Sequence, residues 1–388
     1  MKNTTVVIVS SHSSLESGGV GTHLDILIKN VHRNSKITPY VVLGTRGLKQ
    51  IISFKLSKLI SRIIPTYSDL STIFIRILLL KKEIEKIVDN ADDERIVIHA
   101  HDRYAAVAGC LCKAHRNDMT VIQTLHAPFS DQFYVDGLPS AILDHFIRYI
   151  DAAAVKKIDK YIAVDELQKK LLVEYFPSES SGKDIHIISN AVEQSLFDFP
   201  QKKKLKTNTL VIARHLQKKN GVDSILRAIA MCESKQKIQA HIIGDGPERH
   251  TIENLIKELN LEAVVILKGR LPRAQTLVEI NNAFASVVPS VPVGNYIEAT
   301  SLTMLETLAL RTPLIASNIG GIRQVLSGNN AAILCEPGNY VELSNAIDTV
   351  FEGRKGENIQ VDNGYNLVKA NYGEDIWFQK IISVYGVV

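Results

Sequence analysis

Two glutamates that frame the start of a predicted helix are the residues best placed to do chemistry. Seven residues separate Glu298 from Glu306, and Thr300 and Ser301 between them are types that favour a helix N-cap. Apolar residues then recur at helical spacing, so we expect Glu298 in the loop before the helix and Glu306 more than one turn inside it. Free N–H groups at a helix start can bind a phosphate. Carboxylates on both sides suit a ligand with hydroxyls at both ends, such as a nucleotide sugar, although acids at a helix start are often only solvated surface.

A basic loop lies in the same half of the chain. Arg214 and Lys219 both fall in a predicted strand-to-helix loop. A guanidinium and an ammonium together can grip a diphosphate and stabilise the negative charge of a departing nucleoside diphosphate. The alternative is an ordinary solvated basic loop.

A glycine-rich loop follows the first predicted strand. Gly18, Gly19 and Gly21 would allow the backbone to approach a phosphate closely. The loop is a poor dinucleotide fingerprint because Leu24 stands where a third glycine belongs, which disfavours a nicotinamide dehydrogenase. A tight turn that needs glycine explains the loop equally well.

Three histidines lie at or just past predicted strand ends, where ligand-binding residues of α/β folds gather. They are His99, His101 and His126. The first two could suggest a metal, but no third ligand is near them in the sequence, and the chain has no Asp-x-Asp. We therefore predict a site that needs no metal or other cofactor. The alternative is that His99 is packed within its strand and that His101 and His126 cap loops.

The elements that must position these residues are short apolar runs alternating with helical patterns, which is typical of parallel sheets covered on both faces. We expect two doubly wound, Rossmann-like α/β domains with a ligand cleft at the carboxyl ends of their strands. The predicted strands are 6–10, 40–43, 96–99, 120–125, 161–164 and 185–188, then 210–213, 240–243, 264–267, 286–288, 314–316 and 332–334.

The domain boundaries follow from composition. We expect a first domain over residues 1–197, a polar lysine-containing linker over 198–208 and a second domain over 209–365. The remaining residues, 366–388, should hold a terminal helix that crosses back to the first domain. A chain of 388 residues is long enough for two domains, and 45% hydrophobic and 22% charged residues are typical of a folded protein.

Composition also excludes several classes. A net charge of +4 does not call for a nucleic-acid partner. Four cysteines without a Cys-x-x-Cys favour a reducing cytoplasm over a disulfide framework or structural zinc. The first apolar run is too short for a signal peptide, and no run approaches the ~20 residues that span a bilayer.

Residues 47–88 combine apolar and basic side chains. Lys55, Lys58 and Arg62 repeat at helical spacing. Residues 73–82 are strongly apolar and are interrupted by a few basic residues. This pattern favours peripheral contact with an anionic membrane at the inner face of the cell membrane, and hence a lipid-linked substrate. The alternative is ordinary helices that pack on the first sheet. The aliphatic parts of their lysine side chains would then lie on apolar surface, and the ammonium groups would reach water.

The order and spacing of the motifs resemble the retaining GT-B glycosyltransferases of family 4, from Val6 to about Tyr385. Any single motif is weak, but together they are specific. The matching segments are Gly18–His23, His99–Asp102, Thr124–His126, Asp159–Val164, Ile188–Glu193, Arg214–Gly221, Gly244–Pro247, Pro289–Ser290, Glu298–Glu306 and Gly320–Ile322. Ser301 departs from the glycine that many members have at its position.

The resemblance implies transfer of a hexose from a nucleotide-diphosphate sugar without a metal, with retained anomeric configuration and with closure of the two domains. Arg214 and Lys219 would grip the diphosphate, Glu298 would face the sugar and His126 would hydrogen-bond it near the reacting carbon. Glu306 would bind the ribose. The implied donor-binding residues are Gly18, Gly19, Leu271, Ser301, Leu302, Thr303 and Glu306, with the backbone at Leu271 contacting the base.

The expected reaction glycosylates a hydroxyl of a glycan or glycolipid, in cell-surface polysaccharide or glycolipid biosynthesis. A covalent intermediate needs a carboxylate beneath the anomeric carbon. Glu298 is the one candidate, and the family places it beside the ring, so we favour a front-face reaction. The alternatives are a nucleotide-sugar epimerase or phosphorylase of the same fold, or a non-catalytic nucleotide-sugar-binding scaffold. The residues leave open whether uridine or guanosine carries the sugar.

Overall fold

The computed structural model divides the chain into two compact units, residues 1–188 with 378–388, and residues 189–377. It describes residues 3–12, 15, 18–44, 68–91, 95–114, 116, 118–126, 141–200, 208–294, 296–353 and 361–387.

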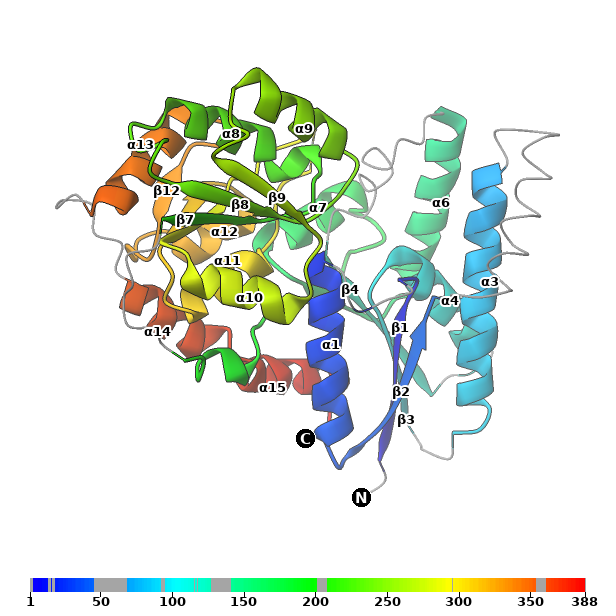
Figure 1. The fold of residues 1–388 in the computed structure, drawn as a ribbon. Coiled ribbons are helices and arrows are strands. Elements are labelled where there is room, and N and C mark those ends of the chain that lie inside the picture. The colour runs from blue at the N-terminus through cyan, green and yellow to red at the C-terminus, as the bar shows by residue number, and fades with distance from the viewer. Residues whose placement is uncertain are drawn as a thin grey trace. The chain divides into compact units, whose positions relative to one another are not determined.

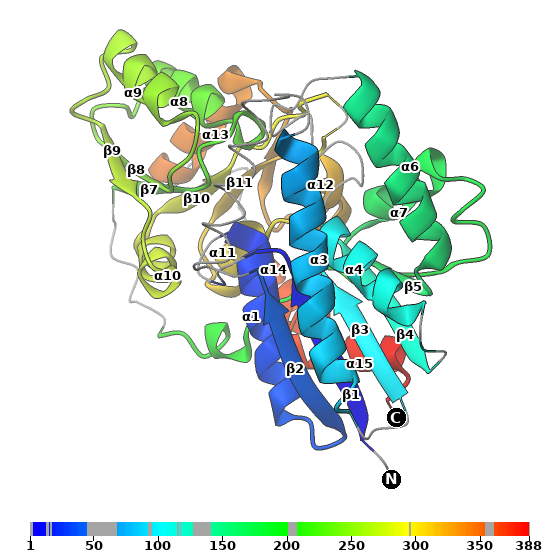
Figure 2. The same ribbon diagram turned by 90° about the vertical axis from the view of Figure 1, so that its right-hand side faces the viewer.

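The first unit is built on a parallel sheet whose strand order is β2-β1-β3-β4-β5-β6. Figure 1 shows α1 on one side of this sheet and α3 and α4 on the other, and in Figure 2 α3 and α4 cross the face toward the viewer. The strands are β1 (Thr4–Ser10), β2 (Ile37–Leu43), β3 (Arg95–Ala100), β4 (Met119–Leu125), β5 (Lys160–Ala163) and β6 (Asp184–Ile187). The helices are α1 (Gly18–Arg33), α3 (Ser68–Val88), α4 (Arg103–Lys113), α6 (Ala141–Lys157) and α7 (Glu166–Tyr175).

The second unit repeats this design in the strand order β12-β11-β10-β7-β8-β9. Figure 1 shows α8, α9 and α13 above the sheet and α10 and α11 below it. The strands are β7 (Thr209–Ala213), β8 (Gln239–Ile243), β9 (Val265–Gly269), β10 (Ala285–Val288), β11 (Leu314–Ser317) and β12 (Ile333–Cys335). The helices are α8 (Val222–Met231), α9 (Arg249–Glu258), α10 (Arg273–Asn282), α11 (Leu302–Ala309), α12 (Gly320–Leu326), α13 (Tyr340–Glu352) and α14 (Val361–Asn371).

All twelve predicted strands are present, and the two-domain Rossmann-like α/β prediction is confirmed. The central strands read as continuous apolar runs because helices cover both of their faces, and every residue of β1 is buried. Strand β2 begins earlier than predicted, at Ile37, and includes Pro39. A proline is tolerated there because β2 is an edge strand.

Two features differ from the sequence expectations. The units divide the chain at Ile188 and Trp377, so residues 189–197 lie with the second unit rather than the first. The expected terminal segment, residues 366–388, contains the end of helix α14, which begins at Val361, and a second helix, Glu374–Tyr385. Helix α14 forms because Tyr365 and Val368 are buried in the core that also contains α11. Most of the expected linker, residues 201–207, lies outside the described residues.

Helix α3 packs on the first sheet. Ile77, Leu80 and Ile84 on one face are buried in the core, whereas Leu78 is 57% exposed. The sheet-packing alternative therefore describes this helix, while Lys55, Lys58 and Arg62 lie outside the described residues, so membrane contact stays a prediction. Among the helices that the structure describes, none is long and apolar enough to cross a membrane.

The final helix, α15 (Glu374–Tyr385), begins in the second unit and ends in the first. Tyr385 Oη lies 2.6 Å from Nδ1 of His99 in β3. Lys160 Nζ donates to the carbonyl of Val384 over 3.1 Å. These contacts fix the last eleven residues to β3 and β5 of the first sheet.

Candidate active site

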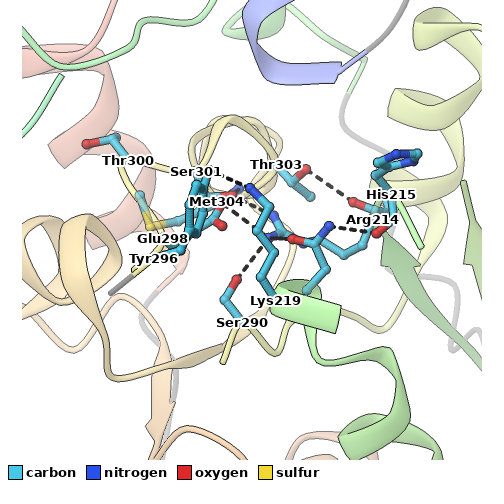
Figure 3. Close-up of polar contacts among 12 residues, drawn as sticks. Arg214, His215, Lys219, Ser290, Tyr296, Glu298, Thr300, Ser301, Thr303 and Met304 are labelled. Carbon is cyan, nitrogen blue, oxygen red and sulfur yellow. Dashed lines mark hydrogen bonds and ion pairs between the residues drawn. The ribbon is translucent and has the colours of Figure 1, made fainter. Parts of the chain in front are cut away.

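Arg214 is the centre of a charged cluster in the second unit (Figure 3). It directly follows β7 and is only 8% exposed. Its Nη1 donates to Ser301 Oγ over 3.2 Å, its Nη2 donates to Ser290 Oγ over 2.9 Å, and Nη2 lies 3.1 Å from a carboxylate oxygen of Glu298. A buried guanidinium needs such partners, and here all three come from the loop of residues 289–301, which joins β10 to α11.

The start of α11 lies within this cluster. Ser301 is its N-cap, and the Ser301 Oγ accepts from the N–H of Met304. Thr303 donates its hydroxyl to the carbonyl of Ala213, which ties the first turn of the helix to the end of β7. Glu298 precedes the helix and Glu306 is its fifth residue, as predicted. The first N–H groups of α11 therefore lie beside a buried cation, an arrangement suited to an anion.

Lys219 joins the cluster from a short 3-10 helix, Lys218–Asn220. Its Nζ donates to Tyr296 Oη over 2.6 Å and lies 4.0 Å from the centre of that ring. Gly221, which directly follows this short helix, has a φ of 62°. A Cβ there would lie 1.9 Å from the carbonyl oxygen of Pro289, so only glycine fits at the turn that presents Lys219.

The positive charges of Arg214 and Lys219 decide the protonation state of Glu298. Burial disfavours its ionised form, but Arg214 and Lys219 outweigh that effect and hold its pKa below the ordinary value. The carboxylate is therefore ionised at neutral pH, and the cluster contains one negative and two positive side chains.

Glu306 belongs to a second cluster that sequence reasoning missed. Arg273, at the start of α10, places its Nη2 2.9 Å from Glu306 Oε1 and also contacts Glu193. Burial raises the pKa of Glu306, and the positive charge of Arg273 offsets this only in part. The signal available in the sequence was a basic residue directly after the turn of Leu271 and Pro272. Leu271 itself is half-buried against the same core.

Histidines form a third cluster, in the first unit. His101 is 2% exposed, and its Nδ1 lies 3.2 Å from Nε2 of His126. The ring of His23, on α1, lies 4.6 Å from the ring of His126. His99 Nε2 is 2.7 Å from Thr124 Oγ1. Burial lowers the pKa of His99 to about 3 and lowers the pKa values of His101 and His126 well below the ordinary value, so these imidazoles are neutral at neutral pH.

A third potential metal ligand does lie near His101 in space, although none is near it in the sequence. His23 and His126 each bring one ring nitrogen so close that the three nitrogens lie within 4.8 Å of one another. The reason is topological: β3 and β4 are neighbouring parallel strands, and α1 starts at the same edge of the sheet. The packed-strand interpretation of His99 is correct.

Asp102 and the glycines have local structural roles. Asp102 caps α4 by accepting from the N–H of Ala105 over 3.0 Å and also accepts from the hydroxyl of Ser10. Gly18 and Gly19 are the first residues of α1, and Gly18 has a φ of 75°, which favours glycine. Donor contact by these glycines stays a prediction.

The structure thus groups the predicted site residues by unit. Arg214, Lys219, Glu298 and the Ser301–Thr303 turn lie together, and the side chain of Leu302 is buried in the core, so only its backbone can meet a ligand. Glu306 pairs with Arg273 farther along the same helix. His126, Gly18 and Gly19 belong to the first unit.

Comparisons with known proteins identify both halves. The family Glycosyltransferase Family 4 matches residues 17–196, and Glycosyl transferases group 1 matches residues 193–367. N-acetyl-alpha-D-glucosaminyl L-malate synthase of Bacillus anthracis is 24% identical over 316 residues, which are 78% of this chain and 77% of that enzyme. Glycogen synthase of Mycobacterium tuberculosis is 22% identical over 258 residues, 66% of this chain and 60% of that enzyme.

Solved structures agree in fold. HepE of Anabaena in complex with UDP has a TM-score of 0.71 at 15% identity, with both chains fully covered. Sucrose-phosphate synthase from Thermosynechococcus elongatus has a TM-score of 0.74 at 16% identity over 99% of this chain and 98% of that one. With its two parallel-sheet units and its consecutive family matches, this chain belongs to the family 4 glycosyltransferases of the GT-B fold.

Proposed function

We propose that the protein transfers a hexose from a nucleotide-diphosphate sugar to a hydroxyl of a glycan or glycolipid, with retained anomeric configuration and without a metal requirement. The observation that carries the proposal is the convergence of Arg214, Glu298 and Ser301 at the start of α11. HepE, a structural neighbour, is known with UDP and with UDP-glucose, which supports a nucleotide-sugar donor and makes uridine the first nucleotide to test.

In this proposal the donor diphosphate lies against the first N–H groups of α11, at Ser301–Thr303. When the donor binds, Arg214 and Lys219 exchange some of their hydrogen bonds to the protein for hydrogen bonds to phosphate oxygens. Glu298 accepts from hydroxyls of the sugar and Glu306 accepts from those of the ribose. The backbone at Leu271 contacts the base, and that of Gly18 and Gly19 approaches the donor from the first unit when the two units close around it.

The transfer step is a front-face substitution. The bond between the anomeric carbon and the phosphate oxygen breaks while the acceptor oxygen bonds to the same face of that carbon. The acceptor proton passes to the leaving phosphate oxygen. Arg214 and Lys219 stabilise the charge that develops on the diphosphate, and neutral His126 hydrogen-bonds the sugar near the reacting carbon.

We further propose that the acceptor is lipid-linked and that the protein works at the cytoplasmic face of the membrane in cell-surface polysaccharide or glycolipid synthesis. The basic and apolar composition of residues 47–88 supports this. Co-sedimentation with phosphatidylglycerol vesicles at low salt tests it, with phosphatidylcholine vesicles as the control. Protein that stays in the supernatant with both would contradict it.

The first experiment on the proposed function is a thermal-shift screen with a panel of nucleotide sugars. The true donor should raise the melting temperature by mass action, whereas donors of other bases should not. Turnover of that donor is then measured. A scaffold would neither transfer nor hydrolyse it, and an epimerase would release an altered sugar without any acceptor.

The charged residues provide the sharper test. Arg214→Ala and Lys219→Ala should each lower kcat by at least about a hundredfold, because each removes charge stabilisation of the leaving diphosphate. Lys218→Ala is the matched control, since Lys218 is the exposed neighbour in the same short helix and should leave kcat unchanged. Near-full activity in both site variants would end the proposed mechanism.

A further inference from the structure

Three imidazole rings gather in one cluster, those of His23, His101 and His126. A hydrogen bond to a sugar would need only one of them. Only His126 has a place in the proposed transfer. His101 is almost fully buried, and within the described residues its Nε2 has no hydrogen-bond partner. A buried polar atom in that state is uncommon in a folded protein. The other ring nitrogen of His101, Nδ1, lies 3.2 Å from Nε2 of His126.

The geometry matches a small cation. One ring nitrogen from each histidine lies within 4.8 Å of the other two. Zinc–nitrogen bonds of about 2.0–2.1 Å in a tetrahedral site require nitrogens about 3.3 Å apart, so small side-chain rotations would complete the site. The three residues come from separate elements, α1, the end of β3 and the end of β4, which hold them on a rigid sheet edge.

The neighbouring His99 is excluded as a ligand. Its Nδ1 faces the hydroxyl of Tyr385 at 2.6 Å and its Nε2 faces the hydroxyl of Thr124 at 2.7 Å. Both nitrogens are thus occupied, and the ring forms one wall of the cluster, with its centre 4.2 Å from that of His101. Three histidines remain, which leaves a fourth position of a tetrahedral metal open for water.

The donor set selects the metal. Three imidazoles suit zinc, cobalt, nickel and copper, whereas magnesium and calcium prefer carboxylate and carbonyl oxygens.

We propose that His23, His101 and His126 form a binding site for a zinc-class divalent ion in the first unit. The site lies in the first unit, whereas the diphosphate cluster lies in the second, and the metal ion has no role in the proposed transfer step. If the proposed function holds, a metal on His126 removes the hydrogen bond that this residue makes to the sugar. Zinc would then inhibit transfer reversibly, and a chelator would restore it.

Metal binding is measured on the full chain, purified without a polyhistidine tag and treated with a chelator. Cobalt(II) titration should produce the visible absorption of a tetrahedral cobalt site that saturates at one equivalent, and zinc should abolish it by displacement. Magnesium should not compete. Absence of the cobalt band at one equivalent would overturn the proposal, whether or not the protein transfers sugar.

Variants assign the ligands. His126→Asn and His23→Asn should each weaken cobalt binding at least about tenfold. His32→Asn is the matched control because His32 is exposed at the other end of α1, and it should bind as the wild type does. Melting curves in chelator confirm that each variant folds. His126→Asn is decisive if His23→Asn does not fold, because His126 is half-buried. Unchanged cobalt affinity in His126→Asn would refute the site.

Discussion

At the residue scale, Arg214 and Glu298 neutralise each other before any ligand binds. The guanidinium is 3.1 Å from the carboxylate and also bonds two serine hydroxyls. Buried ion pairs of this kind are retained where their specificity is useful, and their net contribution to stability is small. The pair keeps the guanidinium oriented toward the start of α11.

The pH dependence of stability should reveal this pair. The pKa of Glu298 is lower in the folded chain than its ordinary value of 4.5, so its ionised form stabilises the fold above that pH. This contribution is lost as the pH falls below 4.5 through the folded pKa. Urea unfolding at neutral pH and at about pH 4 should show a smaller loss for Glu298→Gln than for the wild type. The exposed Glu258→Gln is the control and should match the wild type.

Arg273 should set the pKa of Glu306 and thereby donor binding. Without Arg273, the pKa of buried Glu306 rises further, and the protonated carboxyl is a poorer acceptor for ribose hydroxyls. We expect Arg273→Met to raise KM for the donor about tenfold with little change in kcat, because the lost interaction is uniform binding. KM should rise as the pH falls, and this rise should begin at a higher pH in the variant. Equal KM profiles for variant and wild type would show that Arg273 has only a structural role.

At the element scale, the turns at the ends of parallel strands matter most. The loop after β7 carries Arg214 and Lys219, and it can do so only because Gly221 takes a left-handed conformation against the carbonyl of Pro289. The loop before α11 ends in Ser301, whose hydroxyl both caps the helix and accepts from Arg214. Local backbone geometry thus positions the charged groups.

A pair of glycines tests this. Gly221 and Gly353 have φ angles of 62° and 60°, but a Cβ at Gly353 meets nothing within 4 Å. Gly353→Ala should cost only the left-handed strain, about 1–2 kcal/mol. Gly221→Ala adds the clash with Pro289 and should cost about 3 kcal/mol or more. Chemical unfolding measures both, and similar losses would show that the loop can shift freely.

The cap of α11 offers a second test at this scale. Ser301→Ala and Ser301→Gly both remove the acceptor for Met304 N–H and for Arg214. Glycine suits the N-cap better than alanine, so Ser301→Ala should cost about 0.5–1 kcal/mol more than Ser301→Gly. Unfolding free energies compare the two variants. A larger loss for glycine than for alanine would contradict the capping role.

At the scale of the whole molecule, each unit has its own hydrophobic core, and the last eleven residues belong to the first. Tyr385→Phe removes the hydroxyl from buried His99 and should destabilise the first unit by about 1–3 kcal/mol. Hydrogen exchange should show faster exchange in β1, β3 and β4 and no change in β7 or β8. Tyr149→Phe, at a side chain that is 73% exposed, is the control.

The sequence by itself determined the strands, the class of each sheet and the positions of Glu298 and Glu306 around the start of α11. These features depend on apolar periodicity and capping, which act between residues close in the chain. The same local signals did not show that α14 begins at Val361, before the expected boundary at residue 365, because Tyr365 and Val368 of this helix are buried against the α11 core.

Only the tertiary structure decided which side chains meet. The pairing of Arg273 with Glu306 joins residues 33 positions apart, and the meeting of His23 with His126 depends on the order of strands in the sheet. Such contacts are set by long-range packing and by the charge and burial that follow from it. Spacing along the chain therefore identified the charged residues but could not show their partners or their protonation states.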